Sequence, residues 1–135
     1  MKHLNLKNTA AKGFSLVEML VVIAVIGVIA AIAIPSIGNI NSSAKTATNQ
    51  RNAQSIVSMY QAGAAAGVAW GGTDRNSQVT AVVTGAFPSD GAFANKTFKV
   101  PNMSTDDQKA AYPYIGLETG TTDLFYDKSG GQAAS

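Results

Sequence analysis

The pattern of apolar and polar residues begins with one long apolar run. This run covers residues 14–34 and is interrupted only by Ser15, Glu18 and Gly27. As a helix it would span about 31 Å, because each helical residue adds about 1.5 Å, and the hydrocarbon core of a bilayer is about 30 Å thick. We therefore predict that residues 14–34 form a single membrane-spanning helix.

Beyond the run, apolar residues recur at steps of three and four residues with polar residues between them, which is the period of an amphipathic helix. The recurring positions are Ile37, Ile40, Ala44, Ala47, Ile56 or Val57, Tyr60 and Ala64. Arg51 also falls on this stripe, so we expect its head group to point outward. The helix is predicted to continue through residues 35–66 with a kink at Pro35, because proline cannot donate a helix hydrogen bond.

The remaining segment, residues 67–135, contains many small and polar residues and predicts a small globular domain with a flexible tail from Ser129. Residues 97–100 and 124–126 have the β-branched and aromatic content of strands. The expected fold class is α+β. A long N-terminal helix would pack on a small domain with a short antiparallel sheet and one or two short helices.

Two short segments of this domain are candidates for its helices. Residues 105–108 match a capping box and predict a helix that ends by Pro113. Ser77 could cap a short helix that runs through Val83, but residues 78–84 are β-branched enough to form a strand, and the pattern does not separate the two. Trp70 is expected to anchor the end of the long helix to the domain.

The basic residues are unevenly distributed along the chain. The formal net charge is +2, yet Lys2, Lys7 and Lys12 precede residue 14 without any acidic residue. A globular nucleic-acid binder would carry its cations on the folded part, so this distribution argues against nucleic acid as a partner. Positive residues before the apolar run predict a cytoplasmic N-terminus and a C-terminal domain outside the membrane.

The chain has no cysteine and a single histidine, His3. These two residue types provide most nucleophiles, general bases and zinc ligands near neutral pH, so thiolate chemistry and Ser-His-Asp chemistry are excluded after residue 3. We predict that the protein is not an enzyme and that it has no catalytic residues, metal site or cofactor.

One alternative for the apolar run is a secretory signal that is removed from the mature protein. Ala31, Ile32 and Ala33 form a small-x-small cleavage site of the required kind. The apolar cores of signal sequences, however, are about 7–15 residues long and do not carry a carboxylate such as that of Glu18. We therefore favour an anchor that stays attached to the protein.

The segment from Lys12 to Pro35 reads KGFSLVEMLVVIAVIGVIAAIAIP. A basic leader ends in glycine, phenylalanine follows, glutamate stands four residues later, and an apolar helix leads to a proline. This segment resembles the N-terminus of type IV prepilins and of the pseudopilins of type II secretion systems. The rest of the chain carries no comparable signature.

The resemblance implies a processing and assembly site. A prepilin peptidase would cut after Gly13 and remove the basic leader at residues 1–13, and Phe14 would become a methylated N-terminus. Glu18 would pair with the Phe14 amine of a neighbouring subunit, which would set the axial register of a filament. Such a pair is favoured between packed helices, where an unpaired charge is penalised.

The resemblance also implies a function and a set of partners. The protein would be a structural subunit of a type IV pilus or a type II secretion pseudopilus, forming a polymer with itself or with other pilins. A platform protein and an ATPase would assemble it from the inner membrane, where it is a single-pass protein, into a periplasmic or extracellular filament. The alternative is a minor pilin that binds DNA or acts in adhesion.

Two features depart from better-known members of these families. Classical type IV pilins often close a C-terminal loop with a disulfide, and this chain has no cysteine. That departure favours a pseudopilin or a minimal pilin. Glu118, Asp123 and Asp127 do not have the spacing of the calcium loop of major pseudopilins, so no calcium site is predicted.

Overall fold

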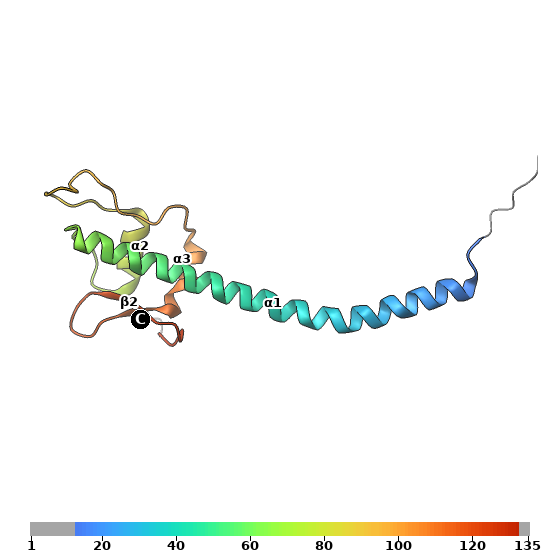
Figure 1. The fold of residues 1–135 in the computed structure, drawn as a ribbon. Helices are drawn as coiled ribbons and strands as arrows, with labels where there is room; N and C mark the ends of the chain where they lie inside the picture. Colours follow the sequence, from blue (N-terminus) through green and yellow to red (C-terminus); the bar gives the residue numbers. More distant parts are fainter. Residues whose placement is uncertain (1–12, 133–135) are drawn as a thin grey trace, which may run out of the picture. The chain divides into compact units, whose positions relative to one another are not determined.

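The computed structural model describes residues 13–132 (Figure 1). These residues form one long helix, two short helices, a short 3-10 helix and a two-stranded antiparallel sheet. The elements are α1 (Leu16–Ala65), α2 (Arg75–Thr84), α3 (Thr105–Ala111), η1 (Tyr112–Tyr114), β1 (Ile115–Leu117) and β2 (Leu124–Tyr126). The predicted α+β fold, with a long N-terminal helix, a short antiparallel sheet and short helices, is confirmed.

The chain divides into two compact units, one ending at Asn41 and the other beginning at Ser42. Helix α1 contributes residues to both units, since it is helical from Leu16 to Ala65. Pro35 therefore does not end the helix. The kink expected at Pro35 stays a prediction.

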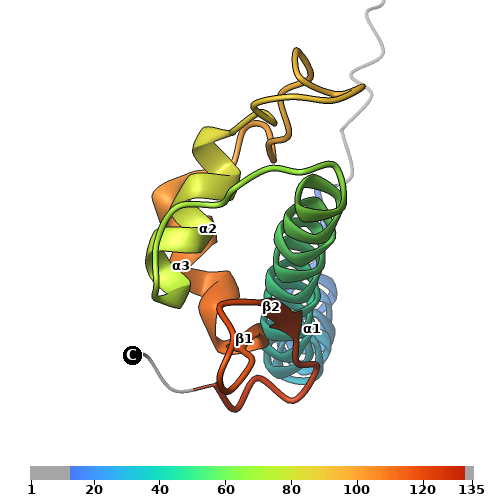
Figure 2. The same ribbon diagram turned by 90° about the vertical axis from the view of Figure 1, so that its left-hand side faces the viewer.

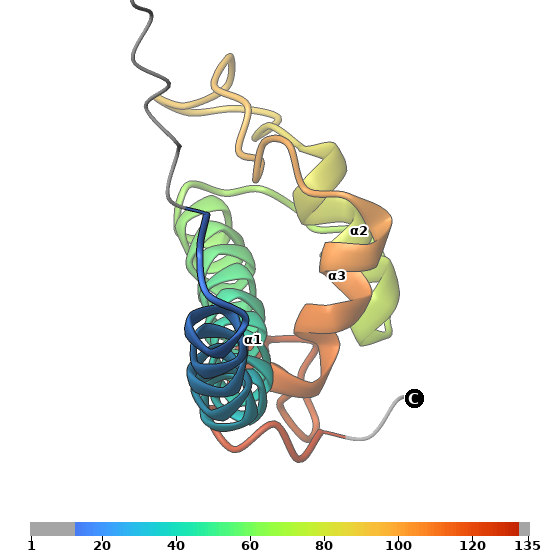
Figure 3. The ribbon, with the colours of Figure 1, turned by 90° about the vertical axis from the view of Figure 1, so that its right-hand side faces the viewer.

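The core of the second unit is built on the C-terminal part of α1. Figures 2 and 3 show α2 and α3 on one side of this part of the helix, with the hairpin of β1 and β2 completing the unit. The buried residues that form the core are Ala53, Ile56, Val57, Tyr60, Val79, Val82, Val100, Ala111, Ile115 and Leu124. The four core residues of α1 follow three- and four-residue steps, so they share one face of the helix.

The buried stripe on α1 is shorter than the sequence predicted. Ile37 and Ile40 are 64% and 65% exposed, and Ala44, Ala47 and Ala64 are exposed as well. Arg51 is exposed, as expected from its long polar side chain. Periodicity alone shows which side of a helix is apolar, whereas the extent of the domain decides how much of that side is covered.

Trp70 packs against the end of α1. Its indole ring stacks on Tyr60 with ring centroids 5.9 Å apart, and its Nε1 donates a hydrogen bond of 2.8 Å to the Tyr60 carbonyl oxygen. A Cβ atom at Gly63 would collide with the Trp70 ring, so the close approach requires glycine at this position. The predicted role of Trp70 as a packing anchor is confirmed.

Of the two structures left open for residues 78–84, the helix is the one observed. The predicted cap was wrong, however, because Asp74 occupies the N-cap position of α2. The Asp74 carboxylate accepts hydrogen bonds from the backbone N–H of Ser77, at 3.0 Å, and from the Ser77 hydroxyl. These bonds lower the pKa of Asp74 below its ordinary value of 3.8. Ser77 thus lies inside the first turn as a donor.

Helix α3 occurs where it was expected, but its capping box starts one residue earlier. The Ser104 hydroxyl oxygen accepts a 3.1 Å hydrogen bond from the Asp107 N–H and donates a 2.7 Å bond to the Asp107 carboxylate. Thr105 is the first helical residue and not the cap. Pro113 follows in η1, where a proline near the start of the helix is tolerated because its missing N–H has no intrahelical partner.

The strand expected at residues 124–126 is β2, and it pairs with β1 so that Gly116 faces Phe125. The Phe125 ring lies over Gly116, since a Cβ atom there would clash with it. The strand expected at residues 97–100 was wrong. That segment makes only an isolated bridge between Ala86 and Phe98. β-Branched content favours an extended backbone, but a strand also needs a partner to pair with. Among the described residues, no second strand runs beside residues 97–100.

The segment after β2 is tied back to the domain as far as the structure describes it. The Gln132 backbone N–H donates a 3.1 Å hydrogen bond to the Pro113 carbonyl oxygen, and its side-chain amide donates a 2.8 Å bond to the Asp127 carboxylate. Hydrogen bonds from Ser129 and then from Gln132 lower the pKa of Asp127.

Candidate functional site

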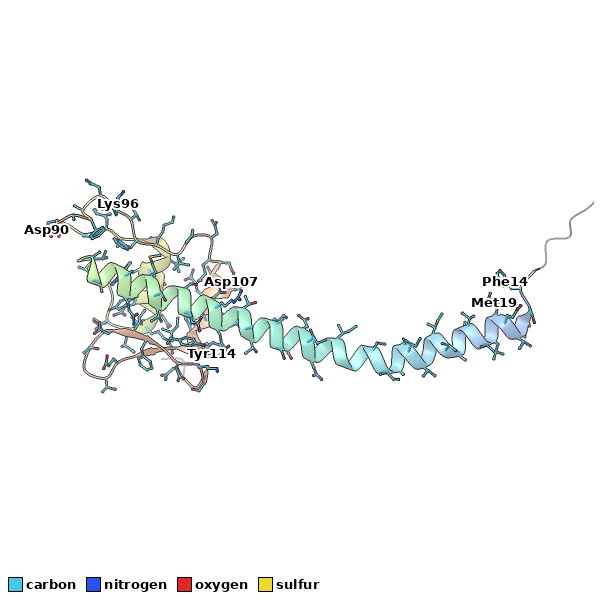
Figure 4. All side chains as sticks on the ribbon, viewed as in Figure 1. Phe14, Met19, Asp90, Lys96, Asp107 and Tyr114 are labelled. Carbon is cyan, nitrogen blue, oxygen red and sulfur yellow. The ribbon has the colours of Figure 1, made fainter. Side chains whose placement is uncertain are left out.

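The first turn of α1 contains two capping hydrogen bonds, one from Ser15 to Glu18 and one from Val17 to Ser15 (Figure 4 shows the labelled neighbours Phe14 and Met19 at this end of the helix). The Ser15 N–H donates to Oε2 of Glu18 at 2.7 Å, and the Ser15 hydroxyl oxygen accepts a 3.3 Å bond from the Val17 N–H. The Met19 N–H reaches the Ser15 carbonyl oxygen at 3.1 Å. Ser15 is therefore the N-cap of the helix, and Glu18 makes the return bond that is typical of a capping box.

Sequence reasoning singled out Glu18 but missed Ser15. The signal was present, because Ser15 and Glu18 match the S-x-x-E pattern just before an apolar run. The structure adds that the carboxylate is held at the N-terminal end of its own helix, where the helix dipole favours negative charge. Glu18 is the only charged residue in residues 14–34.

Gly13 and Phe14 precede the helix and are exposed. A Cβ atom at Gly13 would meet no atom of the described residues within 4 Å. The fold around residue 13 therefore does not require a glycine.

Every large apolar side chain in residues 14–34 is exposed. The exposed fractions run from 47% at Met19 to 80% at Leu16. Helix α1 contains a window with a mean hydropathy of 2.9, and none of that window is buried within the described structure. A helix that is apolar on all sides needs an apolar environment around it. The rest of the chain, as described, does not provide that environment, and the helix fits a single-pass membrane anchor.

Gly27 lies within this apolar helix, and no close contact with the described residues requires a glycine there. A Cβ atom at Gly27 would meet nothing within 4 Å among the described residues. Glycine in the middle of a helix costs roughly 0.5–1 kcal/mol relative to alanine. In a helix that associates with other helices, however, small residues permit close approach of the backbones.

Acidic residues elsewhere serve local hydrogen bonds. The Tyr60 hydroxyl donates to Oδ1 of Asp123 at 3.2 Å and to the Thr122 carbonyl oxygen at 3.0 Å. Burial, together with the neighbouring Asp123 carboxylate, raises the pKa of Tyr60 above its ordinary value of 10.0. Within residues 13–132, no three side chains of the metal-ligating types gather into a cluster that could hold an ion.

Comparison with known proteins identifies the N-terminal segment. A family model described as the prokaryotic N-terminal methylation motif matches residues 8–34. No curated protein and no solved structure matches the chain. The match covers Gly13, Ser15, Glu18 and all the exposed apolar side chains of residues 14–34, which we call the apolar band. The predicted resemblance is therefore confirmed for this segment. The chain therefore carries, in residues 8–34, the N-terminal methylation motif that is the signature of pilins and pseudopilins.

Proposed function

We propose that the protein is a structural subunit of a type IV pilus or a type II secretion pseudopilus, cut between Gly13 and Phe14 and polymerised through residues 14–34. The observation that carries this proposal is the apolar band of α1, whose large side chains are all at least 47% exposed and which lies within the methylation motif. Such a helix is suited first to lipid and then to a bundle of identical helices.

Cleavage by a prepilin peptidase at Gly13 accounts for the position of the glycine. The residue is exposed and a side chain there would meet open space among the described residues, so the fold itself has no need of it. A cut before the apolar band removes the basic leader and keeps the anchor. It also creates a new amine at Phe14, which is the predicted site of methylation.

Glu18 is proposed to pair with the Phe14 amine of a neighbouring subunit. The Ser15 N–H holds the carboxylate at the N-terminal end of α1. In a bundle of parallel helices, the new Phe14 amine of a neighbour would lie at the same end of its own helix. Among packed apolar helices an unpaired carboxylate is penalised more heavily than a paired one. The pair would therefore favour one axial register over all others.

The proposed location follows from the charge and apolar patterns. Residues 14–34 would cross the inner membrane once with the basic leader, residues 1–13, in the cytoplasm, and residues 35–66 and 67–135 would lie outside. Assembly would then require a platform protein and an ATPase, and a bend at Pro35 would help the helices pack. The leader, apart from Gly13, lies outside the described residues.

The motif is that of structural proteins, which are generally not enzymes. A minor pilin that binds DNA would need a cluster of exposed cations. The exposed lysines of the described domain are spread over four segments, and only two of them share one: Lys45 on α1, Lys96 and Lys99 between α2 and α3, Lys109 on α3 and Lys128 after β2. The structural subunit is thus the better supported of the two roles.

The intact mass of the protein extracted from membranes tests this function. Loss of residues 1–13, with or without the mass of one methyl group, is the expected result. Loss of all residues through Ala33 would instead identify a secretory signal. A native protein that retains Met1 and stays monomeric in the membrane would refute the proposal.

A further inference from the structure

An exposed aromatic and basic surface lies on the segment between α2 and α3. The Phe87 and Phe93 side chains are 66% and 50% exposed, and Lys96 and Lys99 are exposed beside them in the sequence. We call these four residues the Phe-Lys loop. Figure 4 places Lys96 on the outer part of this segment together with Asp90. Exposed phenylalanine rings gathered on one segment favour a contact with another molecule.

The Phe-Lys loop is held in place by the domain. Ala86 and Phe98 exchange two backbone hydrogen bonds of 3.1 Å and 2.8 Å. The Phe93 and Phe98 rings meet edge to face with centroids 6.2 Å apart, and Pro88 is fully buried. The backbone that carries these side chains is therefore held in a defined arrangement, which lowers the entropy cost of binding.

A second surface of opposite charge lies beside the hairpin. Glu118, Asp123, Tyr60 and Phe125 line an open groove of about 350 Å³, which we call the acidic groove. The Tyr60 hydroxyl holds the Asp123 carboxylate by the hydrogen bond described above. Phe125 is 38% exposed and supplies an apolar wall. The groove therefore combines two carboxylates with aromatic surface, which suits a cationic and aromatic partner.

The two surfaces cannot meet within one chain. In Figures 1 and 2 the segment that carries the Phe-Lys loop and the β1–β2 hairpin lie on opposite sides of the second unit. Each copy thus offers one surface of each kind. When two different surfaces of the same protein match, the contact between copies is heterologous and can repeat without closing, which is the geometry of a filament.

We propose that the Phe-Lys loop of one copy docks into the acidic groove of the next copy, so that this contact joins neighbouring domains within the polymer. The proposal rests on the proposed function and adds a second contact, outside the apolar band. Lys96 and Lys99 would face Glu118 and Asp123 across the contact. The phenylalanine rings would pack against the exposed ring of Phe125.

Site-specific cross-linking of the full chain in cells tests the contact directly. Because the chain has no cysteine, Asn95→Cys and Thr119→Cys introduce the only thiols and leave the four charged residues intact. With a short bis-maleimide reagent, we expect the double variant to give a ladder of multimers. Each single variant alone should give monomers, and the two single variants expressed together should give dimers. Dimers from either single variant, or no ladder from the double variant, would overturn the proposal.

Charge reversal separates this contact from the proposed function itself. Lys96→Glu with Lys99→Glu, or Glu118→Lys with Asp123→Lys, should lower filament yield about tenfold, since like charges are brought together. All four changes combined should restore it. The control for the lysine variant, Lys45→Glu with Lys109→Glu, makes the same change in net charge as that variant at other exposed lysines.

The behaviour of the unsubstituted chain shows whether the docking proposal or the proposed function has failed. If the parent is processed and forms filaments while the reversed variants assemble normally, only the docking proposal is wrong. If the parent keeps Met1 and never polymerises, the proposed function fails first. If reversal of the two lysines abolishes salt-sensitive retention of DNA by the full chain but leaves filament yield unchanged, the loop binds nucleic acid and the docking proposal is overturned.

Discussion

The two ends of helix α1 carry the same kinds of apolar residue in opposite environments. Ile29, in the first part, is 61% exposed, whereas Ile56, in the second part, is fully buried. Around Ile56, polar residues alternate with apolar ones, so that one face packs on α2 and the hairpin. Around Ile29, all sides of the helix are apolar. The apolar face of the second part of α1 is covered by the protein's own domain. The apolar surface of the first part is not covered by the described residues, so it suits contact with other molecules.

The difference shows that apolar residues act in two ways in this protein, depending on whether they form one stripe or surround the helix. A single apolar stripe directs a helix onto its own domain, and burial of that stripe stabilises the domain by about 25 cal/mol per Å². An apolar surface on every side cannot be buried by one small domain. It directs the helix into lipid or among copies of itself. The experiments below ask whether the two parts of α1 behave as differently as their burial suggests.

The largest effect is expected from a change that blocks processing before the first part of α1 can assemble. Gly13→Leu should leave the precursor uncut, and filaments should be absent, because the peptidase is proposed to need a residue without a side chain. Intact mass of the extracted protein measures this. Gly38→Leu is the matched control, since a Cβ atom also meets open space there among the described residues. Normal removal of the leader from Gly13→Leu would contradict the proposed cleavage site.

The next effect concerns the only charge in the apolar band. Glu18→Gln keeps an oxygen that can accept the Ser15 N–H but loses the negative charge, so the helix should still be capped. We expect normal processing and membrane insertion with at least about a tenfold loss of filaments, measured in material sheared from cells, because pairing with the Phe14 amine is lost. Ser15→Ala removes only the hydroxyl acceptor and should assemble much better than Glu18→Gln. A filament yield from Glu18→Gln that equals that of the parent chain would mean that capping, and not pairing, is the role of Glu18.

A matched pair of substitutions tests the comparison itself. Ile56→Ala should lower the free energy of unfolding of the domain by about 3 kcal/mol, because it leaves a cavity in the core. Ile29→Ala should leave that free energy unchanged and lower filament yield. Trp70, the single tryptophan, stacks on Tyr60 and reports unfolding by fluorescence in detergent micelles. A similar loss of domain stability in both variants would remove the distinction between the two parts of α1.

A smaller effect is expected at the start of α3. Ser104→Ala should destabilise the domain by about 1 kcal/mol, the usual cost of losing an N-cap acceptor. Thr105→Ala, which changes the residue that the sequence pattern had suggested as the cap, should cost less. The fluorescence of Trp70 during chemical denaturation measures both. The reverse order would place the cap at Thr105.

The smallest effect is a pH dependence of the second unit. Hydrogen bonds from Ser77 lower the pKa of Asp74 below 3.8, so folding favours the charged carboxylate. Its contribution is present above the ordinary pKa and is lost as pH falls through and below that value. We expect Asp74→Asn, which cannot ionise but can still cap, to flatten the loss of thermal stability between about pH 5 and pH 3. An unchanged slope would show that Asp74 is not a source of the acid sensitivity.

Some features of this protein are encoded locally, and the sequence was sufficient to predict them. The apolar band needs no tertiary contact to be recognised, since composition and length determine where such a helix is stable. The methylation motif is likewise a run of neighbouring residues. Helix α3 and strand β2 were predicted because each follows from a short local pattern.

Other features depended on residues far apart in the chain. Only the tertiary structure decided that the stripe on α1 is buried from Ala53 and not from Ile37, because the size of the small domain sets the covered length. It also decided that Phe98 bridges to Ala86 without extending into a strand. A periodic pattern records the preference of each side chain, but burial and strand pairing require a partner surface, and that surface exists only once the chain has folded.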